Sequence, residues 1–241
     1  MSEQKRVLPG VSFPYVGRMF APAELFDLDQ TTHAAIFEGG GPAWEALPKI
    51  AGHISAHLQP ANHGDISPRA IIGEQVSIGK GTVVEAGAMI TGPAIIGDNC
   101  IIRHNAYIRA HVIIGDNCMV GNACELKNCL LFNGCEVPHF NYVGDSILGH
   151  RAHLGAGVVL SNVKVTPGNV FVDKADTGLA KLGALIGDSS EIGCNSVLNP
   201  GSVIGRDCIV YPNTTWRGVL AAGHIVKSRS TLEIVKRAES Q

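Results

Sequence analysis

The sequence predicts an all-β fold, a solenoid of short stacked strands, and two observations predict it. A large apolar residue stands at every sixth position from Ile66 to Phe132, without a gap. The composition fits such a repeat, because glycine is frequent, at 29 residues, and aromatic residues make up only 5% of the chain. One six-residue unit cannot bury its own apolar side, so the units must stack, each coil about 4.8 Å above the last through parallel pairing.

The repeat is expected to be interrupted at residues 126–145. Steps of six beyond Phe132 fall on Pro138 and Gly144, and the frame then slips by four residues and resumes at Leu148. Three hexads complete one coil of about 18 residues, so positions one coil apart should be neighbours in space. We expect the interruption to mark a functional region.

The chain divides into three expected parts: a lead-in with a short helical segment (1–62), the solenoid (63–229) and a C-terminal tail that caps the last coil (230–241). Pro22 is expected in the first turn of a short helix. Pro48 should restart or kink a second apolar helical stretch. We expect the apolar face of that stretch to cover the end of the solenoid.

The solenoid is expected to carry one long loop. Residues 161–185 leave the six-residue frame, which returns at Ile186. A loop of this length is costly to order inside a compact domain and is typically functional.

Charge and composition argue against several classes of protein. A net charge of −2 and a pI near 6.5 argue against a nucleic-acid surface built on positive charge. No apolar run approaches the roughly 20 residues that span a bilayer, and the polar N-terminus lacks a secretory signal. We therefore expect a cytoplasmic protein with no membrane partner.

The cysteines are expected to be structural. There are seven, an odd number without paired spacing, which argues against a disulfide framework. Free cysteine behaves as a small apolar residue. We expect buried side chains at the four that share one position of the hexad, Cys100, Cys118, Cys124 and Cys208.

Two cations are expected to stack on successive coils. Arg109 and Lys127 are one coil apart, and Thr91 lies one coil below them. Like charges about 5 Å apart are unfavourable without a counter-anion, and a phosphate would supply one. The alternative is that both are solvated surface residues with carboxylate neighbours such as Glu125.

His139 is the candidate catalytic residue. It follows Pro138, which stands where the count of six requires an aliphatic residue. A general base must titrate near neutral pH, which histidine does without help. The alternative is a structural or surface histidine, the more frequent use of a single imidazole.

The same region resembles a known family. The motifs that carry the resemblance are Glu125-Leu-Lys127, Pro138-His139-Phe-Asn-Tyr142-Val-Gly-Asp145, Leu154-Gly-Ala156-Gly and Ser161-Asn162. They resemble the hexapeptide acyltransferases, and in particular the acetyltransferase half of the bifunctional enzymes that make UDP-N-acetylglucosamine. The resemblance extends from residue 20 to residue 229. It is strongest to archaeal-type sugar-1-phosphate nucleotidyltransferase and acetyltransferase proteins.

The resemblance implies a left-handed parallel β-helix and a homotrimer with active sites between neighbouring helices. It implies an N-acetyltransferase that uses acetyl-CoA and no metal, acts on glucosamine-1-phosphate or galactosamine-1-phosphate, and feeds UDP-N-acetylhexosamine synthesis. His139 would be the general base. The residues that would hold the sugar phosphate are Arg109, Glu125, Lys127, Tyr142 and Asn162, and those that would meet acetyl-CoA are Ala156 and Arg217. Transfer would be direct, with a backbone N–H of the Gly155–Gly157 turn stabilising the oxyanion.

Two departures from the family affect the expected activity. Residues 1–62 offer no counterpart of the nucleotidyltransferase domain with its glycine-rich loop, so pyrophosphorylase activity is not expected. The family also places a lysine shortly after the asparagine of the long loop, and Lys164 is the candidate for that role.

Three alternatives stay open. A γ-type carbonic anhydrase would hold zinc between subunits with imidazoles, but its spacing of five between two ligands does not occur among the histidines of the repeat, which include His104, His111, His139, His150 and His153. A non-catalytic trimer related to nucleotidyltransferases would bind a sugar phosphate without turnover. An acyltransferase for another amine, or for a hydroxyl, is the nearest alternative, because a single hydroxyl separates the two hexosamines.

Overall fold

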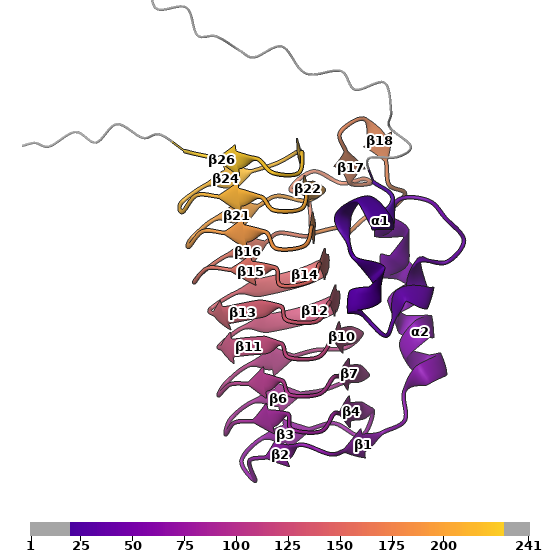
Figure 1. Ribbon diagram of the computed structural model, residues 1–241, viewed down its shortest axis with the longest axis vertical. Helices are drawn as coiled ribbons and strands as arrows, with labels where there is room; N and C mark the ends of the chain where they lie inside the picture. The colour runs from indigo at the N-terminus through magenta and orange to yellow at the C-terminus, as the bar shows by residue number, and fades with distance from the viewer. Residues whose placement is uncertain (1–19, 229–241) are drawn as a thin grey trace, which may run out of the picture.

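The computed structural model describes residues 20–228. The chain forms a left-handed parallel β-helix whose coils stack along the long axis of the molecule (Figure 1), which confirms the predicted fold class. Each coil contributes strands to three faces, and the strands of successive coils pair in parallel. No helix in the described range is both long enough and apolar enough to cross a membrane.

The three faces are named here by their strands. Face 1 consists of β3 (Ile71–Ile72), β6 (Met89–Ile90), β9 (Tyr107–Ile108), the starts of β12 (Glu125–Leu131) and β14 (Tyr142–Leu148), β16 (Val159–Leu160), β21 (Val197–Leu198) and β24 (Thr215–Trp216). Face 2 consists of β1 (Ala61–Asn62), β4 (Val76–Ile78), β7 (Ala94–Ile96), β10 (Val112–Ile114), the ends of β12 and β14, β19 (Ala184–Ile186), β22 (Ser202–Ile204) and β25 (Val219–Leu220). Face 3 consists of β2 (Asp65–Ile66), β5 (Val83–Val84), β8 (Ile101–Ile102), β11 (Met119–Asn122), β13 (Glu136–His139), β15 (His153–Leu154), β20 (Glu191–Ile192), β23 (Ile209–Val210) and β26 (Ile225–Val226).

The interior of the solenoid is filled by the apolar residues of the repeat. Ile90, Ile102 and Ile114 come from three different faces and are all fully buried. The prediction of buried cysteines is confirmed for Cys100, Cys118, Cys124 and Cys208. Their thiols donate to backbone carbonyls of the next coil, as Cys118 does to Phe132 at 3.1 Å, so they serve the packing of the corners.

The repeat changes frame within residues 126–145, as predicted, but its apolar interior is not interrupted. Leu131, and not Phe132, lies opposite Ile114 in the strand register, so the frame has already moved by one residue. The six-residue count places Pro138 and Gly144 at inward positions. In the structure, Val137 and Val143 occupy these positions. The apolar interior therefore continues without a gap through residues 126–145.

The shift in frame arises at the corner between faces 1 and 2. Between Ile108 and Val112 this corner has three residues, whereas β12 and β14 run around it as unbroken seven-residue strands. Asn128 and Asp145 stand at the shortened corners with φ of 45° and 47°, a left-handed conformation that Asn and Asp tolerate better than most residues. The distance between stacked residues falls from 18 to 17 positions as a result.

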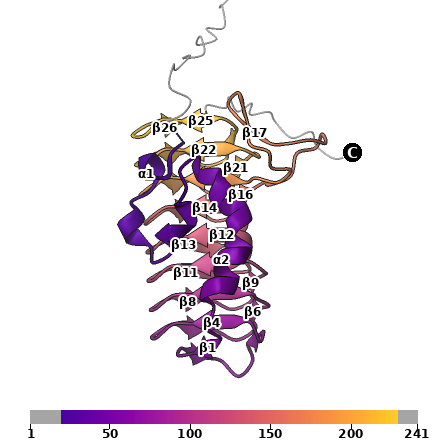
Figure 2. The same ribbon diagram turned by 90° about the vertical axis from the view of Figure 1, so that its right-hand side faces the viewer.

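The N-terminal segment covers face 2. It contains α1 (Pro22–Leu25), the 3₁₀ helices η1 (Leu28–Gln30), η2 (Ala34–Phe37) and η3 (Ala43–Lys49), and α2 (Ile50–His57). Pro22 is in the first turn of α1, and the α-helical stretch restarts at Ile50 after Pro48, as predicted. Figures 1 and 2 show α2 along the side of the solenoid, where it packs on β10 and β12.

The expectation that this segment covers the end of the solenoid is therefore wrong. The physical reason is an apolar column on the outside of face 2. Ile113, Leu130 and Ile147 point outward there in successive coils, and all three are fully buried beneath the segment. A face with outward aliphatic residues needs a cover, and the helices provide it.

Phe132 anchors the segment to the solenoid. It takes the corner position that Gly97 and Gly115 hold in the preceding coils, and its ring lies outside the coil. The ring centroid is 5.1 Å from that of Phe26 and 6.1 Å from that of Phe37. Phe132, which the six-residue count places inside the solenoid, thus joins the N-terminal segment to the outside of the solenoid.

The long loop leaves the solenoid after β16. It contains an antiparallel hairpin of β17 (Phe171–Val172) and β18 (Ala175–Asp176), seen beside the last coils in Figure 1. The repeat returns at Ile186, opposite Leu148, as predicted. The first 19 residues and the expected cap at 230–241 lie outside the described residues, and the division of the chain into three parts stays a prediction.

Candidate functional site

A ladder of three polar side chains lies at the shortened corner. Asn128, Asp145 and Asn162 stack in successive coils, each 17 residues from the next. The Asn128 amide donates to one carboxylate oxygen of Asp145 at 2.8 Å, and the Asn162 amide donates to the other. Lys127 Nζ lies 3.4 Å from this second oxygen. Asp145 is only 6% exposed, so a nearly buried carboxylate holds three partners in place.

Tyr142 extends this network across face 1. Its hydroxyl contacts the side-chain oxygen of Asn162 at 3.5 Å. Gly144 leaves the space for both groups, since a Cβ there would lie 2.6 Å from the Tyr142 hydroxyl and 2.8 Å from the Asn162 amide nitrogen. Burial, and then the charges of Glu125 and Asp145, raise the pKa of Tyr142, which keeps its hydroxyl a hydrogen-bond donor.

Arg109 and Lys127 are neighbours in successive coils, as predicted. The backbone N–H of Arg109 donates to the carbonyl of Leu126 at 2.9 Å, which puts the two residues in neighbouring coils at one corner. Arg109 Nη1 also lies 2.8 Å from Glu125, and this hydrogen bond raises the pKa of the guanidinium. Glu125 and Asp145 therefore supply the counter-charges, so repulsion between the cations is no longer an argument for a phosphate.

His139 lies at the other edge of face 1, at the corner with face 3. It ends β13, its side chain is exposed, and its ring has no hydrogen-bond partner within residues 20–228. The turn that positions it depends on Asn141, which is 2% exposed. Asn141 accepts from the His139 N–H at 3.0 Å and donates to the carbonyl of Gly155 at 2.7 Å.

Ala156 lies beside His139 in the next coil. The N–H groups of Gly157 and Gly155 are engaged, with the carbonyls of His139 at 2.9 Å and Ile192 at 2.6 Å. The N–H of Ala156 has no partner among the described residues. Within the Gly155–Gly157 turn that was expected to stabilise an oxyanion, Ala156 is thus the residue with an available donor.

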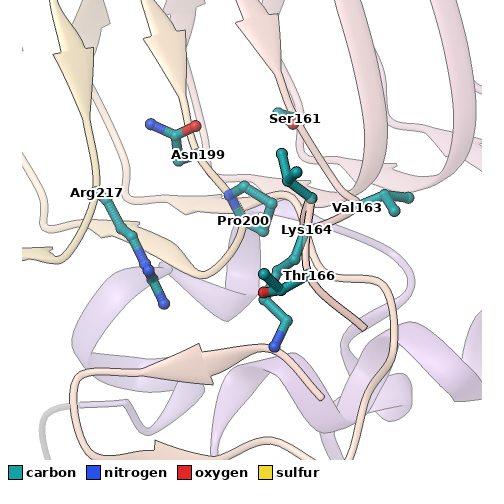
Figure 3. Close-up of a pocket in the computed structure, with 8 residues that line it drawn as sticks. Ser161, Val163, Lys164, Thr166, Asn199, Pro200 and Arg217 are labelled. Carbon is teal, nitrogen blue, oxygen red and sulfur yellow. The ribbon is translucent and has the colours of Figure 1, made fainter. Parts of the chain in front are cut away.

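Arg217 lies two coils away from Ala156, at the corner of face 1 that also carries Lys127. A cavity of ≈ 370 Å³ is present there, and Figure 3 shows the side chains of Arg217 and Lys164 on either side of Pro200. Its lining residues are Ser161, Val163, Lys164, Val165, Thr166, Asn199, Pro200 and Arg217. The two residues implied to meet acetyl-CoA are therefore not brought together within one chain, and Lys164 joins Arg217 instead.

Two histidines of the solenoid pair with different carboxylates. His104 pairs with Glu85 at 3.3 Å, and His153 pairs with Glu191 at 2.6 Å. Within residues 20–228, no three His, Cys, Asp or Glu side chains form a group that could hold a metal ion. Zinc held between subunits stays a hypothesis of the carbonic anhydrase alternative.

Asp145 and Asn128 are the site residues that sequence reasoning missed. Counting in steps of six misses them, because it assumes that stacked residues stay 18 positions apart beyond the shortened corner. The signal that could have found them is the 17-residue spacing of Asn128, Asp145 and Asn162, three short polar side chains in a row. Such a spacing predicts stacking only once the frame shift is known.

Two family models match the chain. The model described as the GMPPB C-terminal domain matches residues 90–177, and the model described as bacterial transferase hexapeptide (six repeats) matches residues 183–215. The first match contains the whole network around Asp145, and the second contains most of the strands that follow the long loop.

Similar proteins include bifunctional archaeal ones. Bifunctional protein GlmU of Methanococcus maripaludis is 31% identical over 121 residues, which cover 49% of this chain and 29% of that protein. A bifunctional sugar-1-phosphate nucleotidylyltransferase/acetyltransferase of Sulfurisphaera tokodaii is 30% identical over 112 residues, which cover 45% of this chain and 28% of that protein. The chain thus spans less than a third of the length of these two relatives.

Among solved structures, a UDP-N-acetylglucosamine acyltransferase from Campylobacter jejuni aligns with 64% of this chain and 68% of its own, at 17% identity and a TM-score of 0.42. That likeness is too distant to bear on function. The fold and the repeat define the chain as a hexapeptide-repeat β-helix protein. Within that class it resembles the C-terminal domain of GlmU-type proteins.

Proposed function

We propose that the chain is an acetyl-CoA-dependent N-acetyltransferase that acts on an amino-sugar 1-phosphate, either glucosamine-1-phosphate or galactosamine-1-phosphate. Its product would be used in UDP-N-acetylhexosamine synthesis, and the active form would be a homotrimer. Support comes from the name of one similar protein, the bifunctional sugar-1-phosphate nucleotidylyltransferase/acetyltransferase of Sulfurisphaera tokodaii. The geometry of face 1 supports the same class of substrate.

The observation that carries the proposal is the arrangement of face 1. An exposed imidazole, that of His139, lies at one edge, and a set of cationic and hydrogen-bonding groups lies at the other. Arg109 and Lys127 supply positive charge, while Tyr142 and Asn162 supply hydrogen bonds. Guanidinium and ammonium groups form strong charge-assisted hydrogen bonds with phosphate. A substrate that carries both a phosphate and an amine needs both kinds of group, and face 1 offers them on one surface.

In the proposed reaction, the sugar amine attacks the carbonyl carbon of the acetyl thioester. The amine loses its proton to the imidazole of His139, and the carbonyl oxygen gains negative charge. The N–H of Ala156 is the proposed donor to this oxygen, because it has no partner among the described residues. Collapse of the intermediate expels the CoA thiolate, which takes the proton back from His139, so no acyl-enzyme forms.

Acetyl-CoA is the proposed co-substrate. Its phosphates suit the cavity lined by Lys164 and Arg217, because both side chains carry positive charge into one space of ≈ 370 Å³. Ala156 lies at the other corner of face 1 from this cavity, and an extended acetyl-CoA, or a site completed by a neighbouring copy of the chain, is proposed to join them. No metal is proposed for this reaction.

Release of free thiol from acetyl-CoA tests the proposal. The acceptors are glucosamine-1-phosphate, galactosamine-1-phosphate and unphosphorylated glucosamine, assayed with wild-type protein and His139→Ala. Turnover that requires both the phosphate and His139 is the expected result, and the ratio of the two phosphorylated acceptors identifies the sugar. A folded protein that turns over none of them would refute the proposed activity.

A sugar-phosphate-binding protein without turnover is the second candidate. The observation that favours it is the pairing of both cations with carboxylates, which lets Arg109 and Lys127 serve the stability of the corner alone. Calorimetric binding of the same sugar phosphates, in a protein that releases no thiol, would identify this function.

A further inference from the structure

We infer that Asp145 is a positioning residue for the sugar-phosphate site, which holds Lys127 and Asn162 in the arrangement that binds the substrate. This inference rests on the proposed function. It concerns a residue that would not itself touch the substrate. The observation behind it is the ladder of Asn128, Asp145 and Asn162 at the shortened corner.

The carboxylate of Asp145 is fully used by protein partners. One oxygen accepts from Asn128, and the other accepts from Asn162 and pairs with Lys127. The residue is 6% exposed, while the Lys127 side chain is 26% exposed. Asp145 therefore lies behind the cation, and the substrate would meet Lys127 first.

The position requires a carboxylate because all three partners are donors. A carboxylate accepts at both oxygens, whereas an amide presents one acceptor and one NH₂ group. In Asp145→Asn, the NH₂ group would face either Lys127 and Asn162 or Asn128, and a donor would oppose a donor. If the oxygen keeps its bond to Asn128, the lysine and Asn162 lose their common partner.

The shortened corner explains why Asp145 can reach both neighbours. Its φ of 47° and the 17-residue spacing align it with Asn128 below and Asn162 above. Asn162 in turn contacts the Tyr142 hydroxyl at 3.5 Å. One buried carboxylate thus fixes the side chains of Lys127 and Asn162 directly and that of Tyr142 through Asn162.

Asp188 offers a matched control. It is 8% exposed, accepts the N–H groups of Asp27 at 2.6 Å and His150 at 2.7 Å, and lies 3.3 Å from Arg206. It is thus also a nearly buried carboxylate with several donors and one cation, but it joins the N-terminal segment to the solenoid. Asp188→Asn reports the cost of losing a buried carboxylate away from face 1.

The kinetic experiment compares full-length wild type, Asp145→Asn, Asp188→Asn, Lys127→Ala and the double variant Asp145→Asn/Lys127→Ala. Loss of positioning should lower kcat/KM of Asp145→Asn by about 10- to 100-fold with the phosphorylated amino sugar. Asp188→Asn should keep the wild-type kcat/KM at temperatures where it is folded. Because Asp145 acts through Lys127, its substitution should cost less in the Lys127→Ala background than in wild type, by a factor of about three or more.

A structural measurement decides the inference independently of activity. Crystal structures of wild type and Asp145→Asn should show the Lys127 and Asn162 side chains displaced in the variant. Unchanged positions of both side chains would overturn the inference, as would a wild-type kcat/KM or equal costs of Asp145→Asn in the two backgrounds. A wild type without turnover of any amino-sugar phosphate would instead refute the proposed function, and the crystal structures would still decide the role of Asp145.

Discussion

Two polar clusters on the same solenoid differ in how deeply their side chains are buried. In the regular coils, Glu85 pairs with Arg103 and His104, and the three side chains are 33%, 41% and 56% exposed. In the shortened coils, Asp145 pairs with Lys127, and these side chains are 8% and 26% exposed. The Glu85 cluster of the regular coils is thus exposed, whereas removal of one corner residue places Asp145 beneath its partners.

The difference has a physical consequence for binding. Exposed pairs contribute roughly 0–1 kcal/mol and are screened by salt. A nearly buried carboxylate with three partners restricts those side chains much more, because leaving any donor unpaired there is costly. The shortened coils can therefore hold a preorganised site on an otherwise repetitive surface.

The largest expected difference between the two sets of coils is in catalysis. His139→Ala should lower kcat by about 10²- to 10⁴-fold with little change in KM, because a general base acts in the transition state. His104→Ala is the matched control, since His104 occupies the same corner two coils earlier, paired with Glu85. Steady-state kinetics of thiol release measure both, and equal losses in the two variants would contradict a special role for the shortened coils.

The second difference is in stability. Phe132 replaces a glycine of the regular coils and is fully buried against Phe26 and Phe37. Phe132→Ala should lower the free energy of unfolding by about 3–5 kcal/mol, since it opens a cavity between the N-terminal segment and the solenoid. Chemical denaturation measures the loss. Phe171→Ala, which truncates a ring that is 41% exposed in the long loop, should cost much less, and similar values would show that Phe132 does not anchor the segment.

A smaller difference is expected for the cations. Lys127→Ala should raise KM for the phosphorylated amino sugar by about 10- to 100-fold and leave kcat nearly unchanged, the effect of losing a charged hydrogen bond. Arg103→Ala removes a cation of the regular coils and should leave KM unchanged. Initial rates over a range of sugar concentrations decide between them. An equal fall in kcat and rise in KM for Lys127→Ala would count against a simple phosphate contact.

The fold was predictable from the sequence because its cause is local. A large apolar residue every six positions specifies an inward side chain in each short strand, and the return of the frame at Ile186 is equally clear. The cover of face 2 was not predictable in the same way. It depends on Ile113, Leu130 and Ile147 pointing outward, and a sequence does not say which of two adjacent aliphatic residues lies inside.

The candidate site was predictable in its residue types and not in its connections. The neighbouring positions of Arg109 and Lys127 follow from an 18-residue spacing that holds below the shortened corner. The role of Asp145 depends on a one-residue change of register, which a buried Phe132 at the next step conceals. Removal of a single residue shifts the register of every later side chain, so contacts beyond the shift can be assigned only from the structure.

The smallest expected effect concerns the packing within the N-terminal segment at low pH. The ring of His33 lies 3.0 Å from that of His53, with His57 stacked on the latter. Burial, followed by the charges of His53 and His57, lowers the pKa of His33 to about 4, although Asp116 opposes the shift. The folded chain therefore binds fewer protons than the unfolded chain between about pH 6.5 and pH 4. Stability should be intact above this range and fall by about 1–2 kcal/mol across it, a value reduced for the partial exposure of the ring.

Denaturation curves at about pH 7.5 and pH 4.5 measure this loss. His33→Gln cannot take up the proton and should lose less stability on acidification than wild type, while His63→Gln changes an exposed histidine and should behave as wild type. If His33→Gln kept the full wild-type dependence on pH, protonation of other groups would cause the acid loss.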